Sequence, residues 1–492
     1  MRVIVVGAGV AGLGSALGLA RAGHRVTLLE RDATPMPANA AEAFEWDRRG
    51  APQVRHSHAF LARLRNTLRD RYPDVLAALI DAGATEMRFG ENPPPTMVGL
   101  EPEPSDEDLG MLACRRTTFE WVLRRIVTAE AGVVLQTGSA VVGLTADRSA
   151  ARAHVTGVRL ADASTVAADL VVAAVGRRSA VPEWLSELGV AEVPDEVDDT
   201  GIVYLSRFYA LRDECDFPAR AGVVGGDLGY LKYGVFIGDN RTFSVTLATP
   251  TADDELRRLL SDPERFDAAS RQLVVAAPFL DGRATPLGTD ATRVHVMAGL
   301  LNRWRDYVID GRPVATGIVP VGDAVLCTNP LYGRGCATGF WGAELLTAAI
   351  DEHPHDVGAA ALAYDDALRR EIRPWYRAGV EQDADARRVA SALLAGEDPD
   401  ADATDPRTQM RAVFRDGLAP AMRADPVVLR AFFRSLNLLT PPDALAKDPE
   451  VGARVYAAWS DRDNRPPDPP LGPATRADLL DALGALGVPS EI

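Results

Sequence analysis

Hydrophobic positions at the start of the chain predict a strand, a helix and a second strand in close succession. Residues Arg2–Val6 form an apolar, β-branched run, and Leu13–Ala22 has the composition of a helix. Gly23 stands where a helix often ends on a glycine, and Arg25–Leu29 is the next apolar run. Because Glu30 follows directly, the second strand is expected to end on a carboxylate.

The hydrophobic pattern of the rest of the chain predicts further helices and strands, then a β-rich stretch, and finally a helical stretch. After the first unit it predicts helices at Ala59–Arg71 and Cys114–Ile126 and strands at Val133–Thr145, Ala153–Leu160 and Thr165–Val175. Longer β-rich runs follow at Gly201–Leu211, Gly229–Ile237 and Thr242–Ala248, with helices at Asp253–Leu260 and Pro263–Ala277. A strand at Ala315–Val321 then precedes a long helix to about Ile350, and from Pro354 the chain is helical.

These elements predict an α/β fold with a discontinuous domain. We expect a Rossmann-type, dinucleotide-binding domain from residues 1–85, 110–198 and 312–352, because the pattern of the first unit resumes after an excursion. Residues 86–109 and 199–311 are expected to form a β-sheet substrate-binding domain. Residues 353–492 are expected to form a helical C-terminal region that braces the other two.

Composition limits the function classes. The 492 residues include 53 Lys and Arg against 69 Asp and Glu, a formal charge of −16, which disfavours nucleic-acid binding. The four cysteines have neither metal-ligand nor disulfide-framework spacing. No apolar run is long enough to span a bilayer, and a strand starting at residue 2 leaves no room for a cleavable signal. A cytoplasmic location is the default expectation.

The turn after the first strand has the chemistry of a dinucleotide site. Gly7, Gly9 and Gly12 have GxGxxG spacing: the first permits a tight turn, the second lets a pyrophosphate approach, and the third allows close packing. Val10 and Ala11, between the second and third glycines, are included among the candidate contacts, and the N-terminus of the following helix favours phosphate. Glu30 can accept both ribose hydroxyls and disfavours a ribose phosphate, so FAD or NAD is expected. Arg31, which follows it, is included among the candidate contacts.

A second glycine-rich segment predicts another cofactor contact. Gly322 and Asp323 end a strand, and Asp323 can accept hydroxyl protons. The following loop runs into a helix start, where backbone N–H groups can face an anionic ring edge. Its candidate contacts are Pro330, Gly333, Gly335 and Cys336.

His56 and His58, with Arg55 beside them, form a third candidate cluster. Two histidines two residues apart can indicate a metal site, but no third ligand stands at suitable spacing. We therefore expect no metal, and a loop packed on a cofactor instead.

With these motifs placed, residues 1 to about 350 resemble the flavoprotein monooxygenase superfamily of the para-hydroxybenzoate hydroxylase fold. The resemblance implies that the GxGxxG turn and Glu30 hold the ADP half of FAD. It implies that Arg116 contacts FAD, that Asp323 binds the ribityl chain, and that residues 329–335 lie beneath the flavin ring. The segments around His58 and Gly335 are most similar to a branch with bacterial polyether epoxidases, geranylgeranyl-reductase-like enzymes and flavin halogenases, in which Arg55–His58 would flank the flavin.

The resemblance leaves several functions open. The first hypothesis is an FAD-dependent monooxygenase that hydroxylates or epoxidises a hydrophobic, secondary-metabolite substrate with O2, through a hydroperoxide of the reduced flavin. His56 or His58 could then donate a proton, although each is more often a packing residue. Tyr209, Tyr230 and Tyr233, with Lys232, are weaker substrate contacts, because the core is the default place for an aromatic residue on a sheet. The alternatives are a flavin-dependent reductase of carbon–carbon double bonds and a non-catalytic FAD-binding protein.

Two departures from the family pattern affect the electron source and the reaction. Val175 stands where hydroxylases that reduce themselves with NADPH tend to have aspartate, which disfavours direct use of NADPH. Reduction of FAD by NAD(P)H directly and reduction through a partner flavin reductase both stay open. Halogenases of this fold carry a lysine beside a tunnel and a Trp-x-Trp-x-Ile signature. The sequence has no such signature, and its only lysines are Lys232 and Lys447, so halogenation is disfavoured.

Overall fold

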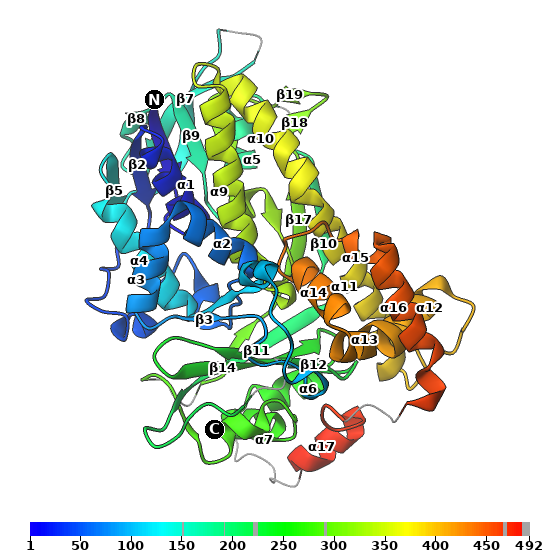
Figure 1. Cartoon of the computed structure of the whole chain (residues 1–492). Coiled ribbons are helices and arrows are strands. Elements are labelled where there is room, and N and C mark those ends of the chain that lie inside the picture. The colour runs from blue at the N-terminus through cyan, green and yellow to red at the C-terminus, as the bar shows by residue number, and fades with distance from the viewer. Residues whose placement is uncertain (150–151, 191, 220–224, 290–292, 466–469, 485–492) are drawn as a thin grey trace.

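A parallel sheet, an antiparallel sheet and a set of C-terminal helices make up the protein (Figure 1). The computed structural model describes residues 1–149, 152–190, 192–219, 225–289, 293–465 and 470–484. The parallel sheet lies near the N-terminus, the antiparallel sheet lies below it in the view, and the orange helices lie to one side. The predicted α/β fold class is therefore confirmed.

The parallel sheet has the strand order β20–β9–β1–β2–β5. Its middle strand β1 lies between β2 and β9, with Val3 opposite Val26 on one side and Leu170 on the other. Runs of Val, Ile and Leu suit such strands because both faces are buried under helices. β20 joins this sheet after the chain has passed through the antiparallel sheet. The strands are β1 (Arg2–Val6), β2 (Arg25–Glu30), β5 (Val133–Thr137), β9 (Leu170–Ala173) and β20 (Ile318–Pro320).

Helix α1 (Val10–Arg21) packs closely on α9 (Gly335–Glu352) because its facing residues are small. A Cβ built on Gly14 would lie 3.0 Å from the Phe340 ring, and one on Gly18 would lie 2.8 Å from Thr347 Oγ1. Gly23 adopts φ +87°, as predicted for the residue that ends α1. The other helices of this part are α2 (Ala62–Arg71), α3 (Pro73–Asp81), α4 (Arg116–Ala129), α5 (Val181–Glu187) and α10 (Val357–Glu371).

Two segments predicted as single strands each form two separate strands in the structure, so these two predictions are wrong. The run Val133–Thr145 is broken at Gly138, which adopts φ +71°, so β5 ends there and β6 begins a separate sheet. The run Thr165–Val175 breaks before Asp169, whose carboxylate accepts a hydrogen bond from the backbone N–H of Arg2 at 2.7 Å. Both runs therefore change sheets at a turn. The separate sheet consists of β6 (Val141–Asp147), β7 (His154–Leu160) and β8 (Thr165–Ala167).

The antiparallel sheet has the order β12–β13–β14–β11–β15, with β16 also pairing with β11. Helices cover one face and bury a second apolar core that includes Phe243 and Phe266. The prediction of one continuous helix at Pro263–Ala277 is wrong, because α7 ends at Arg271 and a separate helix, α8, starts at Ala277. The elements are β11 (Ile202–Leu211), β12 (Gly225–Asp227), β13 (Lys232–Ile237), β14 (Thr242–Pro250), α6 (Asp254–Leu260), α7 (Pro263–Arg271), α8 (Ala277–Leu280), β15 (Ala284–Pro286) and β16 (His295–Met297).

Short ladders join the main parts. β10 pairs with β17, which also pairs with β21 just before the second glycine-rich loop. The ladders consist of β3 (Thr85–Met87) with β4 (Met111–Ala113), of β10 (Asp195–Asp199) with β17 (Leu301–Arg305) and β21 (Leu326–Cys327), and of β18 (Val308–Ile309) with β19 (Arg312–Pro313).

The C-terminal part is helical, and several of its helices begin at an Asp-Pro pair. Asp405, Asp425 and Asp448 each cap a helix whose first residue is proline, since the carboxylate accepts from the first free N–H groups and proline needs no partner there. The helices are α11 (Arg373–Leu394), α12 (Pro406–Val413), α13 (Ala419–Ala424), α14 (Pro426–Leu436), α15 (Ala444–Lys447), α16 (Pro449–Ser460) and α17 (Arg476–Gly484). Within the ranges given above, no helix is long and apolar enough to cross a membrane.

Candidate functional site

The glycine turn after β1 has the form that a dinucleotide site requires. Gly7 adopts φ +101°, and a Cβ there would lie 2.4 Å from the Ala174 carbonyl oxygen. A Cβ on Gly12 would lie 1.9 Å from the Gly7 carbonyl oxygen, so packing explains both glycines. Gly9 differs, because a Cβ built there would meet no described atom within 4 Å. The start of α1, at Val10 and Ala11, therefore borders open space into which a ligand can come close to the backbone.

Glu30 is held at the end of β2 by backbone N–H groups. Its Oε2 accepts from Ala8 at 3.1 Å and its Oε1 accepts from Asp32 at 2.9 Å. Each carboxylate oxygen retains a second lone pair, so the group can still accept from two hydroxyls. Arg31 is exposed, and the structure does not bring it to this carboxylate.

Arg48 is a site residue that sequence reasoning missed. Its guanidinium donates to Glu120 Oε1 at 2.7 Å, to Asp32 at 3.2 Å and to the Ala8 carbonyl at 3.2 Å. The side chain is 3% exposed, whereas that of the adjacent Arg49 is 80% exposed. Nothing in the local sequence separates the two arginines, because the distinction comes from the distant Glu120 on α4.

Arg116 begins α4 and faces the second glycine-rich loop. Its guanidinium donates to Cys336 Sγ at 2.9 Å and to Glu120 Oε2 at 3.1 Å. Its Nε is buried and has no hydrogen-bond partner among the described residues. A buried donor without a partner is unfavourable, so this N–H is available for a bound group. Burial raises the pKa of the Cys336 thiol, which keeps it protonated.

Gly322 and Asp323 lie against the first turn of α1. Gly322 adopts φ +59°, and a Cβ there would lie 2.6 Å from Ala11 Cβ. Burial raises the pKa of the Asp323 carboxyl, while the nearby charges of Arg116 and Arg177 oppose that shift. In the described part of the chain the Asp323 carboxylate accepts no hydrogen bond. It is therefore free to accept from the hydroxyls of a ligand.

The loop before α9 is hydrogen-bonded to the C-terminal helix α11. Asp383 on α11 accepts from Asn329 Nδ2 at 2.8 Å, from Asn302 Nδ2 at 2.6 Å and from Tyr332 OH at 2.8 Å. Asn302 Oδ1 in turn accepts from the Asn329 backbone N–H at 2.8 Å. Sequence reasoning missed Asp383, because no motif connects residues so far apart in the chain.

The same loop places its predicted residues around the helix start. Pro330 begins a short helical turn that ends at Gly333, where φ is +64° and a Cβ would lie 2.9 Å from Ala59 Cβ. Gly335 is the first residue of α9, and a Cβ there would meet no described atom within 4 Å. We call the glycine turn, Glu30, Arg116, Asp323 and residues 329–336 the cofactor cradle.

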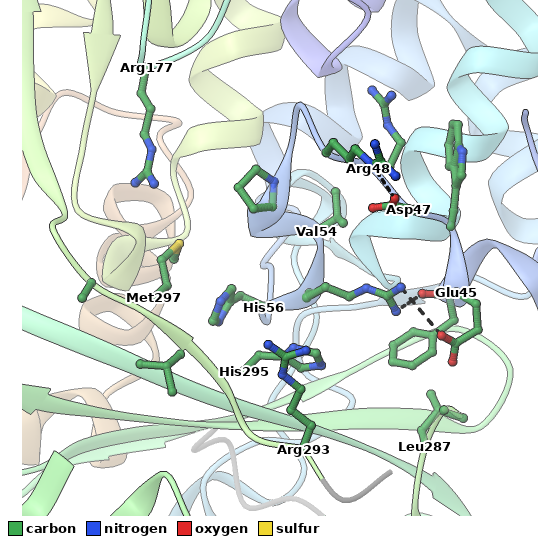
Figure 2. A pocket seen from close by; sticks show the side chains of 18 residues that line it. Glu45, Asp47, Arg48, Val54, His56, Arg177, Leu287, Arg293, His295 and Met297 are labelled. Carbon is green, nitrogen blue, oxygen red and sulfur yellow. Dashed lines mark hydrogen bonds and ion pairs between the residues drawn. The ribbon is translucent and has the colours of Figure 1, made fainter. Parts of the chain in front are cut away.

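A cavity of about 660 Å³ adjoins the cradle (Figure 2). It lies between residues 44–56, Arg177 after β9, and residues 287–288 and 293–298, which include β16 of the antiparallel sheet. His56 lines it, and Arg55 lies beside His56 with its guanidinium over the Phe44 ring. The structure therefore brings two of the three residues of the predicted Arg55–His58 cluster to a cavity wall.

His56 is tied to a chain of buried hydroxyls. Its Nδ1 lies 3.1 Å from Ser206 Oγ, which lies 2.8 Å from Thr246 Oγ1. Thr246 donates to Ser57 Oγ at 2.6 Å, and Ser57 Oγ lies 2.7 Å from Ser244 Oγ. Burial, with the nearby His295 and His58, lowers the pKa of His56 to about 3, so the ring is neutral at pH 7.

His58 lies on the cradle side of the same segment. Its Nδ1 is 2.9 Å from the His56 carbonyl oxygen, to which it donates. Burial and the charge of Arg116 lower the pKa of His58 to about 3. Among the described residues, no group of three His, Cys, Asp or Glu side chains could hold a metal ion.

The three candidate tyrosines do not line the cavity. Tyr209 donates to Asp267 at 2.6 Å, Tyr230 to the Pro473 carbonyl at 2.8 Å and Tyr233 to the Leu471 carbonyl at 2.7 Å. Their rings belong to the apolar core of the antiparallel sheet. Lys232 pairs with Asp227. The structure therefore separates these residues from the cradle.

The cradle fits FAD on the evidence of its own residues. It offers a helix start with open space at Gly9, a carboxylate at Glu30, an unpartnered buried N–H on Arg116 and an available carboxylate at Asp323. Diphosphate, ribose and polyol hydroxyls need acceptors and donors of these kinds.

Comparisons with known proteins agree with this chemistry. Residues 2–43 match the model of the FAD dependent oxidoreductase family. Protein Rv3254 of Mycobacterium tuberculosis is 30% identical over 362 residues, which is 68% of this chain and 69% of that protein. An FAD-dependent urate hydroxylase of Mycolicibacterium vanbaalenii is 24% identical over 387 residues, 75% of this chain and 84% of that protein. PqsL, a probable FAD-dependent monooxygenase of Pseudomonas aeruginosa, matches with a TM-score of 0.56 and 18% identity over 80% of this chain and 96% of that one.

The chain belongs to the FAD-dependent monooxygenase family of the para-hydroxybenzoate hydroxylase fold. The predicted family is thus confirmed. Because monooxygenases are oxidoreductases, the protein is an FAD-dependent oxidoreductase. Membership of the family also implies that its cofactor is FAD. The likeness to PqsL establishes the fold alone, so substrate and reaction outcome have to be argued from the cavity.

Proposed function

We propose that the protein uses FAD and O2 to hydroxylate or epoxidise a hydrophobic small molecule of the kind made in secondary metabolism. The supporting observation is that the cavity adjoins the cradle at two points. Arg48 lines the cavity and donates to Ala8 in the glycine turn. Arg177 lines it and lies near Asp323. A molecule in the cavity would therefore lie beside the bound cofactor.

The cradle residues would hold FAD in three sections. Bound FAD supplies the redox chemistry, which includes the activation of O2 when it is reduced. Gly7, Gly9, Gly12 and the start of α1 at Val10 and Ala11 would receive the diphosphate, and Glu30 the ADP ribose. Arg116 and Asp323 would bind the ribityl section. Pro330, Gly333, Gly335 and Cys336 would support the ring, with the N-terminus of α9 favouring negative charge near Gly335.

We propose that His56 transfers a proton to or from the substrate. Its ring is neutral and lines the cavity, and Nδ1 faces Ser206 Oγ. The hydroxyls of Ser206, Thr246 and Ser57 form a continuous path along which a proton can move. His58 would position His56, because its Nδ1–H donates to the His56 carbonyl.

The electron source is proposed to be NAD(P)H, either directly or through a partner flavin reductase. Val175 follows β9 and offers no polar group for a nicotinamide nucleotide, which favours the partner. Arg177, two residues further on, extends into the cavity and could attract a nucleotide phosphate, which favours direct reduction.

The test measures oxygen transfer by the FAD-loaded protein. The protein is incubated under isotope-labelled O2 with NADPH or NADH, with and without a flavin reductase, and with farnesol or 2-naphthol as hydrophobic probes. We expect one labelled oxygen atom in the product and NAD(P)H consumption that depends on the probe. Saturation of a farnesol double bond without oxygen uptake would contradict the proposal and favour a reductase. Absence of any oxygen transfer from the reduced protein would also contradict it.

A further inference from the structure

Arg334 is a buried arginine of the cofactor cradle, and it stands immediately before the first residue of α9. Its guanidinium is stacked on two aromatic rings. The Cζ atom lies 4.5 Å from the centre of the Tyr332 ring and 4.9 Å from that of the Trp375 ring on α11. Aromatic faces attract a cation, so the stacking holds this side chain in one place between the loop and α11.

No carboxylate of the described ranges forms an ion pair with Arg334. Within those ranges its guanidinium makes one hydrogen bond, from Nη1 to the Trp375 carbonyl oxygen at 3.4 Å. The carboxylate of Asp383 acts on it from beyond ion-pair distance. The oxygens of that carboxylate already accept hydrogen bonds from three other side chains. The charge of Arg334 is therefore not matched by a direct partner.

Two other buried arginines of the site are matched. Arg48 lies 2.6 Å from Glu120, and Arg116 lies 3.1 Å from the same carboxylate. Burial lowers the pKa of Arg334 to about 10, which still leaves the guanidinium charged at pH 7. A charged group is thus kept in the protein interior without the compensation that its neighbours receive.

The place of Arg334 in the fold adds to this imbalance. The N-terminus of α9 already has partial positive charge from its free N–H groups, and the guanidinium adds a full charge at the same end. The first turn of α9 contains no acidic residue. A Cβ built on Gly335 would meet no described atom within 4 Å, so open space lies beside the helix start. Negative charge brought into that space would be stabilised by both contributions.

We propose that Arg334 stabilises the negative charge that the flavin ring has after reduction, and that it thereby raises the reduction potential of bound FAD. Uptake of two electrons and one proton by the neutral oxidised ring leaves one negative charge on it. A group that favours the reduced form over the oxidised form raises the potential. The inference rests on the proposed placement of the ring against residues 329–336, and it is independent of the substrate and of oxygen transfer.

The competing explanation is that Arg334 only ties the loop to α11. Such a tie would change the affinities for oxidised and reduced FAD by the same factor, and the potential would stay constant. A charge effect changes the ratio of the two affinities. The reduction potential therefore separates the two roles.

The test is spectroelectrochemical titration of the FAD-loaded protein. In the wild type, bound FAD should have a higher potential than free FAD. Arg334→Met keeps a long side chain without charge, and it should reduce the preference for reduced over oxidised FAD about tenfold. That change lowers a two-electron potential by about 30 mV. Arg334→Gln retains an N–H donor for the Trp375 carbonyl and should give the same shift.

Two further variants serve as controls. Arg334→Lys keeps the positive charge, so it should recover at least half of the shift. Arg462→Met removes an arginine stacked at 4.3 Å on the Trp459 ring at the end of α16, and it should leave the potential unchanged.

Several results would overturn the proposal. One is a wild-type potential at or below that of free FAD, which decides the question even where the uncharged variants lose FAD. Another is an unchanged potential in the uncharged variants, which would assign Arg334 to bracing alone. An equal shift in the lysine variant would exclude charge as the cause. A wild-type protein that binds no FAD would contradict the cradle itself, whereas bound FAD with the wrong potential would contradict this inference only.

Discussion

Asp383 on α11 accepts a hydrogen bond from Asn329 Nδ2 at 2.8 Å, although the two residues lie 54 positions apart. This contact ties the C-terminal helices to the loop at the start of α9. The C-terminal region thus contributes directly to the shape of the cofactor cradle.

Asp383→Ala should therefore lower both the free energy of unfolding and the affinity for FAD. The substitution leaves two buried amides and the Tyr332 hydroxyl without their acceptor, which should cost about 3 kcal/mol of unfolding free energy. FAD affinity should fall about fivefold or more, because the loop is no longer held. Denaturant unfolding and FAD titration measure the two effects. Glu381→Ala, an exposed position on the same helix, is the control, and equal effects of the two substitutions would refute the bracing role.

Two glycines of the same turn should respond oppositely to alanine. Gly9→Ala places a methyl in open space at φ −83°, so the apoprotein should keep its stability while FAD affinity drops tenfold or more. Gly12→Ala drives a methyl to 1.9 Å from the Gly7 carbonyl and should cost about 3 kcal/mol or prevent folding. Thermal unfolding of the apoproteins and flavin titration separate the two effects. Unchanged FAD affinity in the folded Gly9→Ala variant would remove the diphosphate assignment.

Replacing Asp323 tests the ribityl assignment. Asp323→Ala removes an acceptor that binds no described residue, so the apoprotein should remain folded while the FAD dissociation constant rises about tenfold. Asp323→Asn keeps the shape of the side chain and one acceptor oxygen, so its FAD affinity should fall less than that of the alanine variant. Flavin fluorescence titration gives the constants. Full retention of FAD by the alanine variant during gel filtration would argue against the assignment.

The stability of the protein should fall in mild acid because of His56. The folded protein lowers the pKa of this ring to about 3, whereas the unfolded chain binds the proton near pH 6.5. Unfolding therefore takes up a proton between these values, so stability is retained above pH 6.5 and lost as the pH falls. Between pH 6.5 and pH 5 the loss due to His56 should be about 1.5 kcal/mol. Urea unfolding of wild type and His56→Gln at both pH values gives the difference, and parallel losses in the two proteins would exclude this role.

The sequence predicted the parts of the site that depend on local geometry. The tight turn at Gly7, the cap at Gly23 and the carboxylate of Glu30 follow from residues next to one another in the chain. Arg48 and Asp383 could not be found in this way, because their partners come from distant helices. The same limit explains the predicted strand Val133–Thr145, whose apolar pattern runs across Gly138 although the pairing partners change there. The aromatic candidates failed to reach the cavity because alternation identifies a buried face but not which core it joins.

The most direct test of the account is anaerobic reduction of the purified protein followed by mixing with O2, with the visible absorbance of the flavin as the readout. The account predicts bound FAD that is bleached by NAD(P)H, alone or with a flavin reductase, and that recovers its colour when O2 is admitted. A protein that holds no flavin, even after FAD is added and the free cofactor is removed, would contradict the cradle assignment and the function proposed from it.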